Sequence, residues 1–271
     1  MTSQPTLADW CHRCPSCGTW GATLPVAIND EDSPIDEVRR EAGLRSIRQR
    51  VSGLILRRIE AAEPPGRRLL DIGSAHGWFV GAAAGSGYVA EGIEPDEGVA
   101  ADAGAPTRVG YFPDALDADE RFDVLTFNDV LEHIPDPRAV VSACREHLSD
   151  GGLLSINIPS SSGLLFRTAV VARKRGSGQG LFDRLWQVGL PSPHLWFFDR
   201  PALVRLCESE GFDVVHAGTL PSMTWRGFWN RAHMDRRPSP ATVAGVAAGV
   251  LSAPLLNRGG DIMHLVLRRR S

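Results

Sequence analysis

The chain has 271 residues, enough for one substantial hydrophobic core with short appendages. Its composition, with 43% hydrophobic and 23% charged residues, is ordinary for a globular protein. The net charge of −3 lacks the basic surplus typical of nucleic-acid-binding domains, so we expect no nucleic-acid partner.

The sequence predicts neither an export signal nor a membrane span. Residues 1–5 lack the basic and apolar segments of a signal peptide. An apolar stretch at 241–256 has 16 residues, interrupted by glycine and proline, whereas roughly 20 are needed to cross a bilayer. The odd number of cysteines, five, does not suit a disulfide framework. We therefore expect a cytoplasmic protein with a buried or interfacial helix at 241–256, which leaves peripheral membrane contact open.

Three cysteines, Cys11, Cys14 and Cys17, lie close together near the N-terminus. The pattern Cys-Pro-Ser-Cys-Gly at residues 14–18 has the form of a zinc knuckle, in which a glycine lets backbone amides turn toward the sulfur atoms. A structural zinc ion requires four ligands, and no second pair of closely spaced cysteines follows. Both a bound structural zinc ion and a remnant loop without metal therefore remain open.

The rest of the chain predicts an α/β fold. We expect a helical stretch from Ile35 and a second helix from Leu44 to Ala62, which Pro64 and Pro65 end. Apolar runs then alternate with helical segments, as in a parallel sheet with helices on both faces. Strands are predicted at 68–73, 88–93, 107–111, 122–127, 152–158, 212–217 and 262–268. Helices are predicted at 77–86, 96–103 and 137–148, and from Arg200 up to Gly211.

Residues 69–77 join a strand to a helix through a turn with two glycines, and they suggest a nucleoside site. Glycine at 73 and 77 lets the backbone approach a ligand where a Cβ atom would clash. Glu94 ends the next strand, 23 residues after Asp71, where an acid can accept hydrogen bonds from ribose hydroxyls. The dinucleotide pattern needs further glycines where Ala75 and Trp78 stand. The turn therefore predicts a nucleoside cofactor without a pyrophosphate.

Three later segments complete a recognisable series. They are the strand and turn at 122–137, the helix end, glycine turn and strand at 148–159, and the His-Leu-Trp-Phe-Phe run at 194–198. Together with the glycine turn and Glu94, this series resembles the class I S-adenosylmethionine-dependent methyltransferases. The resemblance is to the broad group that includes quinone-biosynthesis and small-molecule O-methyltransferases, and it covers about residues 45–268. Ala75 departs from the family, which commonly has a middle glycine there.

The resemblance implies a Rossmann-like, seven-stranded, mostly parallel sheet whose last strand is antiparallel. It divides the chain into an N-terminal segment, 1–45, and a methyltransferase domain, 46–271. It implies S-adenosylmethionine as cofactor. It also implies that the cofactor is bound by residues of the glycine turn, by the acid at the end of the second strand and by the end of the fourth strand. The expected cofactor-binding residues are Asp71, Gly73, Ser74, His76, Gly77, Glu94, Pro95 and Asn128.

Transfer to a hydroxyl needs a group that accepts the hydroxyl proton, and histidine is suited to that task near neutral pH. His133 follows the fourth strand and His194 precedes the last helix, where the fold places the acceptor. We expect both to be catalytic, with His194 the more important. The leading functional hypothesis is methyl transfer to a hydroxyl of a small molecule such as a sugar, a quinone-like phenol or a natural-product intermediate.

A metal-assisted mechanism is the alternative. If residues 129–133 form a helical turn, Asp129, Glu132 and His133 share one face, and His194 can join them. This set resembles the divalent-metal cluster of O-methyltransferases that act on vicinal hydroxyls, with Asp129 in place of a glutamate. A magnesium or similar ion would hold the diol and lower its pKa.

Two segments are candidates for covering the substrate. Residues 160–193 form an insertion that we interpret as a lid, or else as a solvated basic loop around 173–180. Residues 220–258 form a C-terminal cap rich in aromatic residues, for which core packing is the competing interpretation.

Two further functions stay open: a nucleic-acid methyltransferase and a non-catalytic cofactor-binding scaffold. Neither the acceptor nor the oligomeric state can be inferred from the sequence.

Overall fold

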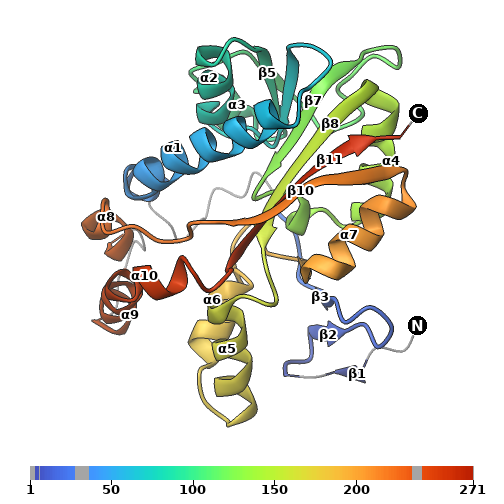
Figure 1. Cartoon of the computed structure of the whole chain (residues 1–271). Coiled ribbons are helices and arrows are strands. Elements are labelled where there is room, and N and C mark those ends of the chain that lie inside the picture. The colour runs from blue at the N-terminus through green and yellow to red at the C-terminus, as the bar shows by residue number, and fades with distance from the viewer. Residues whose placement is uncertain (1–3, 6, 28–36, 234–239, 271) are drawn as a thin grey trace.

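A computed structural model of the chain describes residues 4–5, 7–27, 37–233 and 240–270. Its centre is a seven-stranded sheet with the strand order β10-β11-β8-β7-β4-β5-β6 (Figure 1). Within this sheet β11 runs antiparallel to both β8 and β10, and the other pairs are parallel. The strands are β4 (Arg68–Ile72), β5 (Val89–Glu94), β6 (Thr107–Val109), β7 (Phe122–Asn128), β8 (Leu148–Pro159), β10 (Phe212–Leu220) and β11 (Ile262–Arg269). The expected Rossmann-like sheet is confirmed.

Helices cover both faces of the sheet because its central strands are apolar on both sides. On one face α4 (Pro137–His147) and α7 (Arg200–Ser209) pack through Val141, Cys144 and Leu203. On the other face α1 (Glu37–Ala61) and α2 (Trp78–Gly85) pack through residues that include Ile59 and Phe79. The short α3 (Glu97–Ala101) follows β5 (Figure 1). The central strands are therefore held between two apolar helix layers.

Local sequence signals explain where these helices begin. The side chains of Asp136 and Asp199 accept hydrogen bonds from the backbone N–H of Ala139 and Ala202, and each helix has a proline in its first turn. The N-terminal helices differ from the sequence-based prediction. One continuous helix, α1, replaces the second predicted helix and extends through Gly43, because no proline interrupts it before Pro64. The predicted start at Ile35 lies outside the described residues.

The N-terminal segment forms a second, four-stranded sheet of β1 (Gln4–Pro5), β2 (Cys11–Arg13), β3 (Trp20–Ala22) and β9 (Trp196–Phe197). The insertion at 160–193 folds into α5 (Leu164–Lys174) and α6 (Gln179–Leu185). A short, mostly exposed turn at 175–178 joins them, within the stretch 173–180 that we considered as a solvated basic loop. Phe166 and Trp186 of this insertion are buried against Trp20 and Phe197. The insertion and the N-terminal segment thus share one small aromatic core.

The described part of the segment between β10 and β11 forms three short helices, α8 (Phe228–Ala232), α9 (Pro240–Leu251) and α10 (Ala253–Leu256). Leu220 at the end of β10 pairs with Ile262, and Ile262 pairs with Pro159 at the end of β8. The segment therefore leaves and re-enters the sheet at the carboxyl edge of the parallel strands. No helix in the described part of the chain is both long and apolar enough to cross a membrane.

The aromatic core gives a test of how the appendages are held. Phe166→Ala should lower the free energy of unfolding by about 3–5 kcal/mol, because it empties a site packed by Trp20, Trp186 and Phe197. Val171→Ala on the same helix is the matched control, since Val171 is 47% exposed, and should change stability by less than about 0.5 kcal/mol. Chemical denaturation measures both, and equal effects would contradict the described packing.

Candidate functional site

The turn after β4 adopts a conformation that requires glycine. Gly73 and Gly77 have φ values of 69° and 72°, and Ala75 between them has a φ of 45°. The backbone N–H groups of Gly73 and Ser74 donate to the Ile93 carbonyl at 2.8 and 3.0 Å, which joins the turn to β5. A Cβ atom on Gly73 would lie 2.6 Å from a methyl carbon of Val130. Left-handed backbone and close packing therefore both exclude larger residues at position 73.

Glu94, the predicted ribose acid, ends β5 beside this turn. Its carboxylate accepts hydrogen bonds from the backbone N–H of Ala75 at 2.9 Å and of Asp96 at 3.1 Å. Burial raises the pKa of Glu94, and these two hydrogen bonds oppose that shift. The carboxylate is thus held at the carboxyl edge, next to the glycine turn.

Asp71 is placed differently from the other predicted cofactor residues, because it is only 2% exposed. Its Oδ1 accepts hydrogen bonds from the Thr126 hydroxyl at 2.6 Å and from the Asn128 amide at 2.8 Å. Burial raises the pKa of Asp71 to about 7, against the effect of both hydrogen bonds. Asp71 therefore links β4 to β7 beneath the turn, and Asn128 reaches the site as its partner.

The remaining predicted cofactor residues surround the same turn. Ser74 is buried, and its hydroxyl has no hydrogen-bond partner among the described residues. The His76 ring lies 6.2 Å from the Trp78 ring, measured between centroids. Pro95 follows Glu94 directly and is half-buried. The sequence-based set is thus brought to one edge of the sheet.

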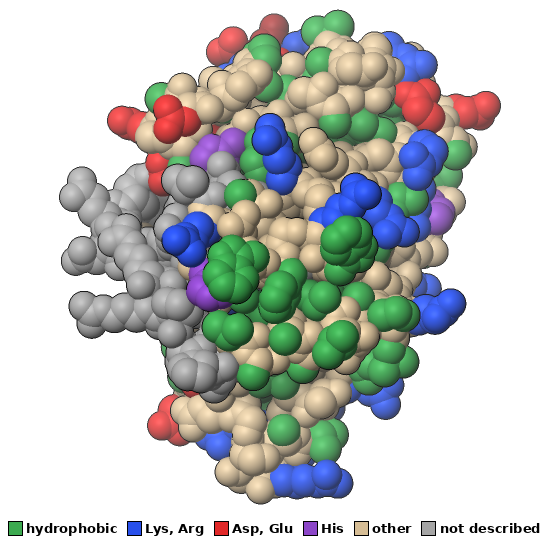
Figure 2. Space-filling model, turned by 90° about the vertical axis from the view of Figure 1, so that its left-hand side faces the viewer, with side chains coloured by type: hydrophobic (Ala, Val, Ile, Leu, Met, Phe, Trp, Pro, Cys, Tyr) green, Lys and Arg blue, Asp and Glu red, His purple; other side chains and the backbone are tan. Residues whose placement is uncertain are grey.

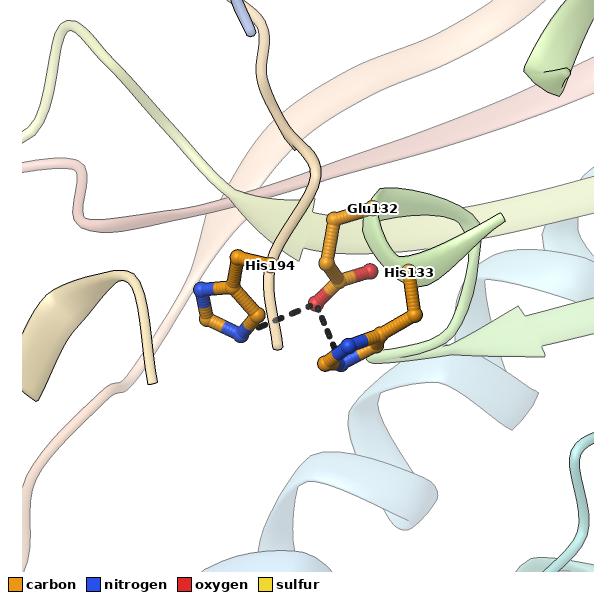
Figure 3. A group of neighbouring side chains, drawn as sticks. All are labelled: Glu132, His133 and His194. Atoms are coloured by element: carbon orange, nitrogen blue, oxygen red, sulfur yellow. Dashed lines mark ion pairs between the residues drawn. The ribbon is translucent and has the colours of Figure 1, made fainter. Parts of the chain in front are cut away.

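A second group of side chains follows β7. The short 3-10 helix η1 (Leu131–His133) carries Glu132 and His133, and a segment just before β9 carries His194. Figure 3 shows both imidazole rings directed at the Glu132 carboxylate. Glu132 Oε1 lies 4.0 Å from His133 Nε2 and 3.9 Å from His194 Nε2, and the two ring centroids are 4.7 Å apart. These distances exceed those of direct hydrogen bonds.

Backbone contacts hold the two segments together. The Leu195 N–H donates to the Glu132 carbonyl at 2.8 Å, and the Trp196 indole N–H donates to the Ile134 carbonyl at 2.9 Å. His133 Nδ1 lies 2.8 Å from the Pro193 carbonyl and must be the donor there, because a carbonyl only accepts. Val130, which packs against Gly73, precedes η1, so this cluster lies close to the cofactor turn.

Glu132 is completely buried, and neither carboxylate oxygen has a hydrogen-bond partner in the described structure. Burial, with a smaller contribution from the charge of Asp129, raises its pKa well above the usual range. A buried, unpartnered carboxylate is costly as a bare anion. The site therefore favours either a protonated Glu132 or a cation beside it.

His194 is the more deeply buried histidine. Burial, and then the neighbouring His133, lower the pKa of His194 to about 3. Its Nε2 lies 2.9 Å from the Gln187 side-chain nitrogen, and its Nδ1 has no hydrogen-bond partner among the described residues. The sequence-based interpretation missed Gln187, whose φ of 55° places it in a turn after α6.

The predicted metal set is brought together only in part. Glu132, His133 and His194 each offer a ligand atom within 4.8 Å of the others. The helical turn expected over 129–133 begins only at Leu131, so Asp129 is not in this group. Asp129 has a φ of 57°, and its carboxylate accepts a hydrogen bond from the Asn157 amide at 3.1 Å. Its backbone therefore directs it away from the helical face on which we expected it.

The N-terminal cysteines do not form a three-ligand group among the described residues. Cys11 is 1% exposed within the aromatic core, whereas Cys14 and Cys17 are half-buried. Hydrogen bonds from Ser16, and then from the backbone and side chain of Cys17, lower the pKa of Cys14 to about 6. The structure thus buries Cys11 in the aromatic core and leaves Cys14 and Cys17 partly exposed, and zinc binding there stays a prediction.

The position of Glu94 predicts its contribution to cofactor affinity. Glu94→Ala should weaken binding of S-adenosylmethionine by about 1.5–3 kcal/mol, the worth of hydrogen bonds to a charged group. Glu91→Ala on the same strand is the control, because Glu91 pairs with Arg108 at 2.8 Å and not with the turn. Titration calorimetry measures both variants. An unchanged affinity for Glu94→Ala would remove Glu94 from the cofactor site.

Comparisons with known proteins identify the family of the chain. Residues 44–217 match the model of a family described as a methyltransferase domain. A ubiquinone biosynthesis O-methyltransferase of Xanthomonas axonopodis pv. citri (strain 306) is 29% identical over 190 residues, which cover 65% of this chain and 73% of that protein.

Two solved structures share the fold. One, provisionally named a sarcosine dimethylglycine methyltransferase, is from Galdieria sulphuraria; it is 14% identical, with a TM-score of 0.60 over 91% of this chain and 94% of that one. The other is a S-adenosylmethionine-dependent methyltransferase from Thermotoga maritima, 18% identical, with a TM-score of 0.53 over 86% and 95%. The chain belongs to the methyltransferase-domain family and is a S-adenosylmethionine-dependent methyltransferase.

Proposed function

We propose that this methyltransferase transfers a methyl group from S-adenosylmethionine to a hydroxyl of a small molecule. The names of the relatives, ubiquinone biosynthesis O-methyltransferases, support oxygen as the acceptor atom. Methyl transfer from a sulfonium needs the two reactants held in contact, and a hydroxyl acceptor also needs a place for its proton. The cluster beside the cofactor turn offers such a place.

His133 is the proposed general base. Because its Nδ1–H donates to the Pro193 carbonyl, Nε2 is the basic atom of the neutral ring. That atom faces the Glu132 carboxyl group, which would stabilise the imidazolium formed when His133 accepts a proton. The observation that carries the proposal is the fixed tautomer of His133. This residue lies three positions after Val130, which packs against Gly73 of the glycine turn.

We assign His194 a positioning role, although the sequence alone favoured it as the main base. Its low pKa, about 3, makes it a weak proton acceptor, and its Nε2 already contacts Gln187. Its ring packs against that of His133. The larger catalytic role that we expected for His194 from the sequence is therefore assigned to His133 in this proposal.

Substitution of each histidine separates the two roles. His133→Ala should lower the turnover number by about 10²–10⁴-fold, the usual contribution of a positioned base, with cofactor affinity unchanged. His194→Ala should have a smaller effect, because it removes a neighbour of the base and not the base. His12→Ala, on β2 and outside the cluster, is the control. If His194→Ala is the more damaging variant, the assignment of the base is reversed.

A metal-assisted reaction on a vicinal diol is a second candidate, favoured by the unpartnered Glu132 carboxylate. Glu132, His133 and His194 would hold a divalent cation, since two imidazoles and a carboxylate form a common ligand set. When bound, such an ion lowers the pKa of a coordinated hydroxyl. The negative charge of Glu132 would then be neutralised by the cation instead of by a proton.

Chelation decides between these candidates. Base-only catalysis predicts full activity in excess chelator, and the metal-assisted reaction predicts loss of activity that magnesium or a similar ion restores. Glu132→Gln keeps the shape of the side chain and removes its charge. Metal analysis of this variant and of the unmodified protein shows whether Glu132 retains an ion. A chelator-resistant enzyme with no bound metal would eliminate the second candidate.

Two other proposals are weaker. A nucleic-acid methyltransferase would need salt-sensitive methylation of bulk RNA, which the net charge of −3 does not favour. A non-catalytic scaffold would leave no reason for a fixed histidine tautomer beside a buried acid. We retain the insertion, 160–193, and the C-terminal cap, 220–258, as the segments that would select the acceptor, because both leave the sheet at its carboxyl edge.

A further inference from the structure

Helix α9 is apolar but is not buried. Its sequence, Pro240–Leu251, contains no charged residue. None of its residues from 243 to 251 is buried in the described structure, and Leu251 is 84% exposed. A helix that is apolar on all sides is normally enclosed by a protein core or by lipid. The surface around α9 therefore lacks a covering layer within the part of the chain that the structure describes.

Large apolar side chains extend this surface onto the neighbouring helices. Trp225 and Trp229 are 71% and 66% exposed, and Leu255 is 62% exposed. The two ends of this segment are joined, because the Asn257 side chain accepts hydrogen bonds from the backbone N–H groups of Ser222 and Met223, both at 2.9 Å. Figure 2 looks onto the side of the molecule where α8, α9 and α10 lie, and it shows large hydrophobic side chains interspersed with basic ones. We call this surface the cap face.

Basic residues outnumber acidic ones in the cap segment and in the insertion. Residues 220–258 contain five arginines and one aspartate, a net charge of +4, and residues 160–193 contain five basic residues and one aspartate, again +4. The whole chain has −3, so the remaining residues carry −11. The two segments lie next to each other, because the Leu164 N–H donates at 3.2 Å to the carbonyl of Gly259, the residue that follows the cap. Arg226 and Arg258 on the cap, and Lys174 on α5, are exposed.

We propose that the cap face docks onto the surface of an anionic lipid bilayer. Its 12 residues make α9 about 18 Å long, too short for a hydrocarbon layer of about 30 Å, so it would lie in the plane of the interface. Tryptophan side chains favour the boundary between headgroups and acyl chains, and arginines attract acidic headgroups. The apolar helix, the two tryptophans and the surplus charge thus fit one occupant.

Other occupants fit less well. A symmetric dimer through this face would place the basic segments of two copies against each other. A nucleic acid would complement the charge but would leave the apolar α9, Leu251 and Leu255 against a polar backbone. A bilayer satisfies both properties. Because β10 ends and β11 begins at the carboxyl edge, docking would also turn this edge of the sheet toward the membrane.

Co-sedimentation with vesicles tests the proposal directly. The full chain should bind vesicles that contain equal parts of phosphatidylcholine and phosphatidylglycerol, should not bind phosphatidylcholine alone, and should be released as salt rises. Arg226→Gln and Arg258→Gln should each weaken the partition coefficient about fivefold. The double variant Trp225→Ala/Trp229→Ala should abolish binding. Val89→Ala, at the opposite edge where Val89 is 72% exposed, should bind normally.

A second readout keeps the test decisive if the alanine variant does not fold. Brominated acyl chains should quench tryptophan fluorescence of the unmodified protein, and much less that of Trp225→Phe/Trp229→Phe. Absence of binding to anionic vesicles would overturn the proposal. So would a lipid-free dimer that Trp225→Ala/Trp229→Ala dissociates, or retention by bulk RNA without retention by vesicles. None of these outcomes depends on methyl transfer, so the proposed reaction stands or falls separately.

Discussion

The hydrogen bonds accepted by Asp71 are the contact on which the site depends. A carboxylate that is 2% exposed receives a hydroxyl from Thr126 and an amide from Asn128, and so joins the carboxyl ends of β4 and β7. The glycine turn starts from one of these strand ends and η1 starts just after the other. The positions of both parts of the site, the glycine turn and the Glu132 cluster, are therefore set by the same pair of strands.

Three acids at this edge of the sheet differ in how their carboxylates are hydrogen-bonded. Asp71 has two donors, and Glu94 has two backbone N–H groups. Glu132 has neither, and its nearest basic atoms are imidazole nitrogens at 3.9 and 4.0 Å. An acid left in this state is typical of a site where a proton or a cation is exchanged. The contrast supports placing the chemistry at Glu132 and His133, and cofactor binding at Glu94.

Much of the framework could be predicted because its signals are local. The turn from Gly73 to Gly77, the acid at Glu94 and the proline behind Asp136 each mark an element through residues a few positions apart. The seven-stranded, mostly parallel sheet with an antiparallel last strand came from the family resemblance, and the structure agrees. Helix ends were less exact: α1 is one helix, because a mid-helix glycine weakens a helix without ending it.

The parts that escaped prediction depend on distant contacts. Trp20 pairs with Phe197 across most of the chain, and this pairing builds the second sheet and buries Cys11. Gln187 meets His194 only because α5 and α6 turn the insertion back toward the site. Asp129 lies off the expected helical face because its backbone adopts a left-handed conformation, which we did not predict from the neighbouring residues.

The central claim, methyl transfer to oxygen of a small molecule, can be tested in one measurement. The enzyme is incubated with S-adenosylmethionine carrying a carbon-13 methyl group and with a bacterial extract, and the products are examined by carbon-13 NMR after separation by size. The account predicts new O-methyl signals in the low-molecular-weight fraction, absent with His133→Ala. Label on nitrogen, or label confined to RNA or protein, would contradict it.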